Sequence, residues 1–147
     1  MARCFFAVWL CSCMLTGCGK AGPEIVEVEG TLTLDGKPLD KVIVEFWPDS
    51  DGPKSSGMTD AQGKFVLKTA DGTRAGAVVS KHKVVLYDES IVKHAFLGRA
   101  GEDVDMTDGQ KPRFLELYTS PTQTPLNIDI TAEKKDVKLE VEAYKEE

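Results

Sequence analysis

Hydrophobic and polar residues alternate along most of the chain from residue 26 onward. In residues 26–34, valines and leucines fall on one side, and glutamates and threonines on the other. Residues 42–46 repeat the pattern with two valines and a phenylalanine. A period of two is typical of a β-strand with one buried and one solvated face. The intervening Asp-Gly-Lys-Pro of residues 35–38 predicts a turn, so we expect these two runs to pair as a β-hairpin.

Further alternating runs follow, separated by turn-forming segments rich in Gly, Pro, Asp and Ser. They cover residues 57–60, 64–69, 82–87, 114–118, 126–131 and 137–142. The chain therefore offers about seven short strands with a turn roughly every ten residues, and no strong helical periodicity. We predict an all-β fold, a seven-stranded (approximately) antiparallel β-sandwich over residues 25–144. An insertion is expected at 88–112, where the alternation breaks.

The N-terminus has a different pattern. After Arg3, residues 4–15 form an uncharged apolar run of about a dozen residues, which suits a signal-peptide core and is too short to span a membrane. It ends in Leu-Thr-Gly-Cys at 15–18, which resembles the lipobox of bacterial lipoproteins. The resemblance implies a lipoprotein signal peptide at 1–17, cleaved before Cys18. The alternative is an uncleaved apolar N-terminus tucked into the fold.

Lipidation of Cys18 is also what the lipobox resemblance implies, with a diacylglycerol and further acyl chains such as palmitate. Residues 18–24 would then be a short lipidated linker, and the other three cysteines would leave with the signal peptide. The mature domain would have no cysteine for a disulfide. Two or three acyl chains hold a protein firmly at a membrane, whereas one binds only marginally.

Charge narrows the range of partners. The chain has a net charge of −6, and removal of 1–17 leaves 17 of the 18 Lys and Arg against 24 Asp and Glu, a net charge of −7. This balance argues against nucleic-acid binding, which needs concentrated Lys and Arg. No polybasic cluster follows Cys18, so lipid would supply the membrane attachment. We expect an exported, membrane-anchored protein. Residue 19 is Gly rather than an Asp of the type that signals retention in the inner membrane, which favours the outer membrane or cell surface.

Several segments together resemble one family. They are V-E-G-T-L-T-L-D-G-K-P-L (28–39), V-I-V-E-F-W-P (42–48), T-D-A-Q-G-K-F-V-L (59–67), G-A-V-V-S-K-H-K-V-V-L-Y (76–87) and L-Y-T-S-P-T-Q-T-P-L-N-I-D-I (117–130). In order and spacing this set is similar to the transthyretin-like (prealbumin-like) sandwich, in the carboxypeptidase regulatory-like version found on bacterial lipoproteins. The resemblance implies a surface, folding or protein-contact module rather than a catalyst.

No catalytic centre stands out in the sequence. Iron dioxygenases that share this fold type hold the metal with two tyrosines and two closely spaced histidines, but His82 and His94 are far apart and Tyr87 and Tyr118 are not obvious partners. We expect His82 to be a half-buried strand residue and His94 a surface loop residue. The C-terminus lacks the Tyr-Arg-Gly-Ser type of ending of the related hydroxyisourate hydrolases. No serine or retained cysteine has a nucleophile's context, so we predict neither enzyme activity nor a cofactor.

Two acidic loops are candidates for calcium, which prefers several carboxylate and carbonyl oxygens. Asp49 and Asp51 lie in one loop, and Asp103, Asp105 and Asp108 in the other. Asp and Gly are also the residues that ordinary turns use, so turn chemistry is the main expectation and calcium the alternative.

Trp47, Ile43 and Tyr87 fall on the nominally solvated side of their strands. Such side chains can form a platform for a sugar or a protein, or they can lie beneath the 88–112 insertion. We therefore expect a non-enzymatic, lipid-anchored envelope protein whose sandwich is a structural or protein-binding module. The alternative is a carbohydrate-binding module of the cell surface.

Overall fold

A computed structural model describes residues 22–91, 112–133 and 135–145. This part contains eleven strands and one short 3-10 helix. The strands are β1 (Ile25–Val26), β2 (Glu29–Leu34), β3 (Lys37–Pro38), β4 (Val42–Pro48), β5 (Ser55–Met58), β6 (Lys64–Val66), β7 (Lys68–Thr69), β8 (Ala77–Val78), β9 (Ser80–Asp88), β10 (Asn127–Ile130) and β11 (Asp136–Val141). The helix η1 covers Glu116–Thr119.

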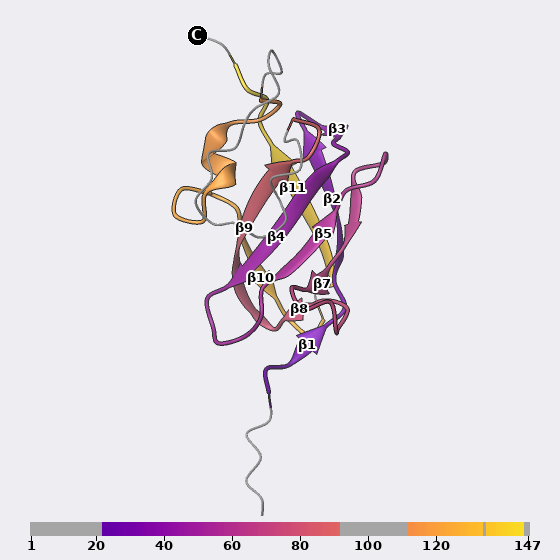
Figure 1. Ribbon diagram of the computed structural model, residues 1–147, viewed down its shortest axis with the longest axis vertical. Coiled ribbons are helices and arrows are strands. Elements are labelled where there is room, and N and C mark those ends of the chain that lie inside the picture. The colour runs from indigo at the N-terminus through magenta and orange to yellow at the C-terminus, as the bar shows by residue number, and fades with distance from the viewer. Residues whose placement is uncertain (1–21, 92–111, 134, 146–147) are drawn as a thin grey trace, which may run out of the picture.

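The strands form two main sheets whose ribbons overlie one another (Figure 1). One sheet has five antiparallel strands in the order β10-β9-β4-β5-β7. The other has β11-β2-β3, with β6 also paired to β2. A two-stranded ladder joins β1 to β8. The predicted all-β sandwich is therefore confirmed, whereas the count of seven strands is not, because the described part has eleven strands, four of them with only two residues.

A single hydrophobic core fills the space between the sheets. Every second residue of β4 and of β11 is buried, as the alternating pattern predicts. The largest fully buried side chains are Phe46 and Phe65, from opposite sheets, whose ring centroids lie 6.3 Å apart. Burial of each such aromatic side chain contributes about 1.5–3 kcal/mol, so the described domain has a substantial core with no disulfide in it.

The predicted hairpin between the first two runs is wrong. β2 turns at Asp35 and Gly36, both with positive φ (47° and 79°), and across this turn it pairs with the two-residue β3 rather than with β4. Pro38 has no N–H to continue a ladder, so the pairing ends there. The chain then crosses to the other sheet, where β4 pairs with β5 and β9. The inward side chains of the two runs therefore belong to opposite sheets.

One pairing departs from the antiparallel expectation. β11 runs parallel to β2 along six residues, from Asp136 opposite Glu29 to Val141 opposite Leu34. The other strand pairs of the described part are antiparallel. The first and last strands of the described part lead to opposite ends of the sandwich: β1 is at the lower end of Figure 1, and β11 leads toward the upper end.

Candidate functional site

Several predicted residues lie outside the described part of the chain: Cys18, His94, Asp103, Asp105 and Asp108. The signal peptide, the lipidation site and the second calcium candidate therefore stay predictions. Asp49 and Asp51 are exposed in the loop between β4 and β5. Within the described residues, no three His, Cys, Asp or Glu side chains are grouped so that they could hold a metal ion.

His82 is buried rather than half-buried, with 1% of its surface exposed. Its ring packs on Phe46, with centroids 5.6 Å apart, and Nε2 lies 2.8 Å from the carbonyl oxygen of Val78. Nε2 must carry the proton, since a carbonyl only accepts; Nδ1 is buried without a partner among the described residues. Burial lowers the pKa of His82 below 6.5, because the charged form is poorly solvated there. The prediction of half-burial failed because this inward strand position lies deep in the core.

The tyrosines do not converge on His82. Tyr87 lies on the opposite face of β9, since side chains alternate along a strand. Tyr118, on η1, is buried, and its ring packs edge-on against Phe114. Its hydroxyl oxygen accepts a hydrogen bond from the backbone N–H of Glu142 at 3.4 Å. The described side chains thus form no His-Tyr metal site.

Trp47, Ile43 and Tyr87 lie on the outer face of the five-stranded sheet and are half-buried. Ile43 is directly opposite Tyr87 in the pairing of β4 with β9. Burial and the charge of Glu45 raise the pKa of Tyr87. The Trp47 indole N–H donates to Glu45 at 3.0 Å, and the Lys54 ammonium lies 3.0 Å from the ring centroid. Because this cation covers one face of the indole, a sugar ring has at most the other face to stack on.

A partly buried ion pair that the sequence did not predict joins Asp88, at the end of β9, to Arg113. The Arg113 guanidinium donates two hydrogen bonds of 2.6 Å to the Asp88 carboxylate, which is 8% exposed. It also donates to the Asp40 carboxylate at 3.2 Å and to the Asp40 carbonyl oxygen at 2.7 Å. These bonds to Asp88 raise the pKa of Arg113. The only sequence signal was an acidic and a basic residue at the two ends of the irregular segment.

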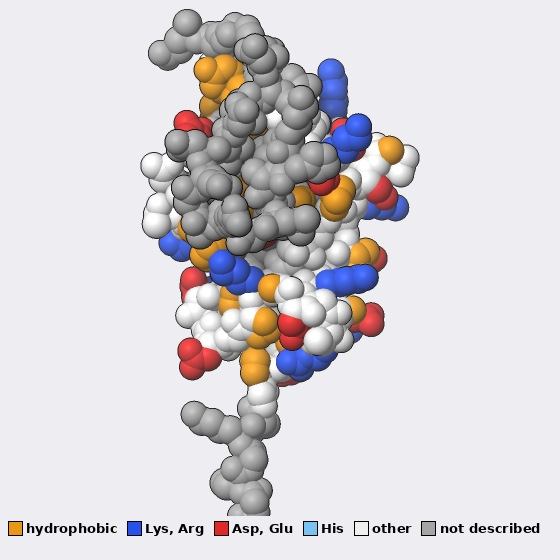
Figure 2. Space-filling model, viewed as in Figure 1, with side chains coloured by type: hydrophobic (Ala, Val, Ile, Leu, Met, Phe, Trp, Pro, Cys, Tyr) orange, Lys and Arg blue, Asp and Glu red, His pale blue; other side chains and the backbone are white. Residues whose placement is uncertain are grey.

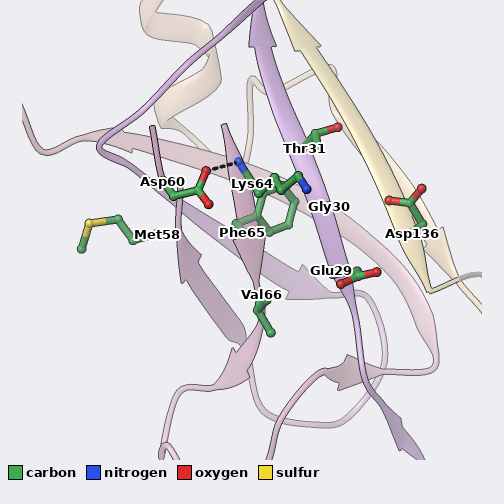
Figure 3. A pocket seen from close by; sticks show the side chains of 9 residues that line it. All are labelled: Glu29, Gly30, Thr31, Met58, Asp60, Lys64, Phe65, Val66 and Asp136. Atoms are coloured by element: carbon green, nitrogen blue, oxygen red, sulfur yellow. Dashed lines mark hydrogen bonds between the residues drawn. The ribbon is translucent and has the colours of Figure 1, made fainter. Parts of the chain in front are cut away.

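A groove of about 640 Å³ is lined by residues of β2, β5, β6 and β11 and of the loop between β5 and β6 (Figure 3). It is lined by Glu29, Gly30, Thr31, Met58, Asp60, Lys64, Phe65, Val66 and Asp136. Gly30 has no room for a side chain, since an added Cβ would lie 2.5 Å from the Phe65 ring. Met58 and Val66 are 52% and 58% exposed, two of the three large hydrophobic side chains exposed in the described part. The groove therefore combines apolar and charged side chains that face solvent.

The charged side chains of the groove differ in the partners that they have within the described part. Asp60 accepts hydrogen bonds at 2.9 Å from the backbone N–H groups of Gln62 and Lys64, so this carboxylate holds a turn. Glu29 and Asp136 stand directly opposite one another on β2 and β11, and no ion pair reaches either of them among the described residues. Figure 3 shows both on the side of the groove away from Met58. Like charges facing each other across two strands destabilise a sheet, so the fold gains nothing from this pair.

The rest of the visible surface carries mixed charge. On the face shown in Figure 2, the described Lys and Arg side chains are interspersed with Asp and Glu rather than gathered into one patch. None of the helices in the described part is long and apolar enough to cross a membrane. No protein-family model, curated protein or solved structure matches the chain. The resemblance to transthyretin-like domains therefore rests on the sequence segments alone.

Proposed function

We propose that this chain is a non-enzymatic, lipid-anchored protein of the cell envelope whose β-sandwich binds another envelope protein. The groove carries this proposal. It exposes Met58 and Val66 beside two carboxylates that have no ion-pair partner among the described residues, and exposed apolar surface rimmed by polar groups can mark an interaction site. The chemistry of the described part also fits a binding module, because the buried side chains of His82 and Tyr118 make hydrogen bonds to the backbone within the fold.

The arrangement of the domain suits a tether at one end. Residues 22–24 lead into β1, at the end of the sandwich opposite to the C-terminal residues (Figure 1). A lipid on Cys18 would be separated from β1 by only a few residues, which span at most about 3.5 Å each. That end of the sandwich would then face the bilayer, and the sheet surfaces would stand along the membrane normal with the groove open to the side.

A substitution of the lipid-bearing residue tests the anchor. Cys18→Ala removes the thiol that would carry diacylglycerol, and we expect the protein to move from the membrane fraction to the soluble fraction. Intact mass of the wild-type chain should show cleavage before Cys18 and the added acyl mass. A Cys13→Ala variant is the matched control, and its fractionation should equal that of the wild type. Membrane association of Cys18→Ala at the wild-type level would contradict the proposal.

A further inference from the structure

The groove beside Glu29 has the chemistry to recognise one kind of partner. Of its charged lining residues, Asp60 is engaged in a turn, and Lys64 is the single basic side chain. Glu29 and Asp136 remain as a pair of adjacent carboxylates without a cationic partner among the described residues. Neighbouring strands lie about 4.8 Å apart and paired residues project from the same face of the sheet, so one guanidinium or ammonium group can contact both carboxylates.

Apolar side chains lie next to this pair. Val66 is directly opposite Glu29 in the pairing of β6 with β2, so the row across the sheet reads Val66, Glu29, Asp136. Met58 lies on the far side of the groove in Figure 3. Arg and Lys side chains bury their aliphatic stems on apolar surface while the charged end stays with its partner. The row thus offers an apolar contact for the aliphatic stem beside two carboxylates for the charged end.

We propose that this groove binds a basic, extended segment of a partner protein. An Arg or Lys of that segment places its charged end between Glu29 and Asp136 and its stem against Val66. This proposal deepens the proposed function and rests on it for the setting, since it names the kind of partner that the module takes. The chain's net charge of −6 disfavours a second copy or an anionic lipid surface as the occupant and favours a cationic one.

Peptide binding to the full chain in mild detergent tests this inference. The probes are three fluorescently labelled decapeptides, in which Val alternates with Arg, with Gln or with Glu. Their binding is measured by fluorescence anisotropy at about 10 mM and about 1 M salt. We expect the Arg peptide to bind, the Glu peptide not to bind, and the binding to weaken at high salt. In the double variant Glu29→Gln with Asp136→Asn, affinity for the Arg peptide should fall about five- to tenfold, as for the loss of two partly exposed ion pairs.

Two controls separate recognition from general charge. Glu140→Gln with Glu142→Gln removes the same charge from exposed positions outside the groove and should leave affinity unchanged. Val66→Thr keeps a β-branched side chain and should weaken binding by removing the apolar contact. The melting temperature of the groove double variant should equal or exceed that of the wild type, because a like-charge contact is removed.

Three results would overturn the inference: no binding of the Arg peptide, equal losses in the groove and control double variants, or a wild-type dimer in sedimentation that only the groove variant dissociates. The last would make the groove a contact between copies of this chain. None of these results bears on the anchor, because Cys18→Ala fractionation is read separately. The proposed lipid anchor and the groove can therefore fail independently.

Discussion

At the scale of single residues, His82 shows how burial changes a side chain's chemistry. The imidazole sits at an inward position of β9, donates from Nε2 to a backbone carbonyl, and leaves Nδ1 without a partner in the described structure. An unsatisfied buried acceptor costs roughly 1–3 kcal/mol, which the surrounding core must offset. The alternation of the sequence predicted the direction of His82 correctly, but the depth of its burial depends on the opposite sheet, which a local pattern does not contain.

Stability should fall as pH drops below about 6.5 because of this residue. Burial holds the folded-state pKa of His82 below its ordinary value, so the unfolded chain takes up a proton that the folded chain resists. The hydrogen bond to the Val78 carbonyl and the charges of Asp49 and Asp129 act to raise the pKa of His82, but they do not reverse this direction. Between pH 7.5 and 5.5 we expect the free energy of unfolding to decline by up to about 1.4 kcal/mol per pH unit below 6.5.

Urea unfolding at several pH values measures this slope. His82→Leu should flatten it, whatever its effect on stability at pH 7.5. His94→Gln, which changes the other imidazole of the chain, should keep the wild-type slope. An equal slope in wild type and His82→Leu would show that His82 is not the group responsible.

At the scale of elements, the connections between strands were the least predictable feature. Period-two alternation identifies which face of a strand is buried, but it does not say which strand is its neighbour. β2 illustrates this, because its partners are β11, β6 and β3, whereas the sequence suggested the next long run. The parallel β2–β11 pair joins segments from the beginning and the end of the folded sequence, and no turn signal in the sequence marks such a contact. Of the features around β2, the tight turn at Asp35-Gly36 is the one that the local sequence predicted.

The ion pair of Arg113 should be the main support for the ends of the 88–112 insertion. Arg113→Ala removes the two charged donors of the nearly buried Asp88 carboxylate and leaves it the N–H and hydroxyl of Ser90, so we expect a loss of about 2–3 kcal/mol in the free energy of unfolding. Arg113→Lys should recover only part of it, because an ammonium group does not form the paired bonds of a guanidinium.

Denaturant unfolding of these variants provides the test. Arg74→Ala is the control, since Arg74 is exposed, and it should change stability by less than about 0.5 kcal/mol. A loss of stability in Arg113→Ala no larger than that of the control would contradict the role given to Arg113.

At the scale of the whole molecule, the sequence predicted the all-β class and the inward-facing positions of strands such as β4 and β11, because both depend on alternation alone. It did not predict the groove, since Glu29, Met58, Val66 and Asp136 come from four strands and meet only after β2 pairs with β6 and β11. The glutamates of the first alternating run, Glu27 and Glu29, were expected to form a solvated face. The structure places one of them opposite a second carboxylate, beside exposed apolar side chains, and this combination is what supports the proposed binding surface.

Photo-crosslinking in intact cells tests the central claim, that the anchored sandwich holds a partner protein in this groove, most directly. A photoreactive residue replaces Val66 in one variant and Glu140, outside the groove, in the other. We predict one discrete adduct from position 66, lost on adding Glu29→Gln and Asp136→Asn, with an Arg- or Lys-rich partner peptide at the crosslink. Absence of an adduct from position 66, or the same adducts from both positions, would contradict it.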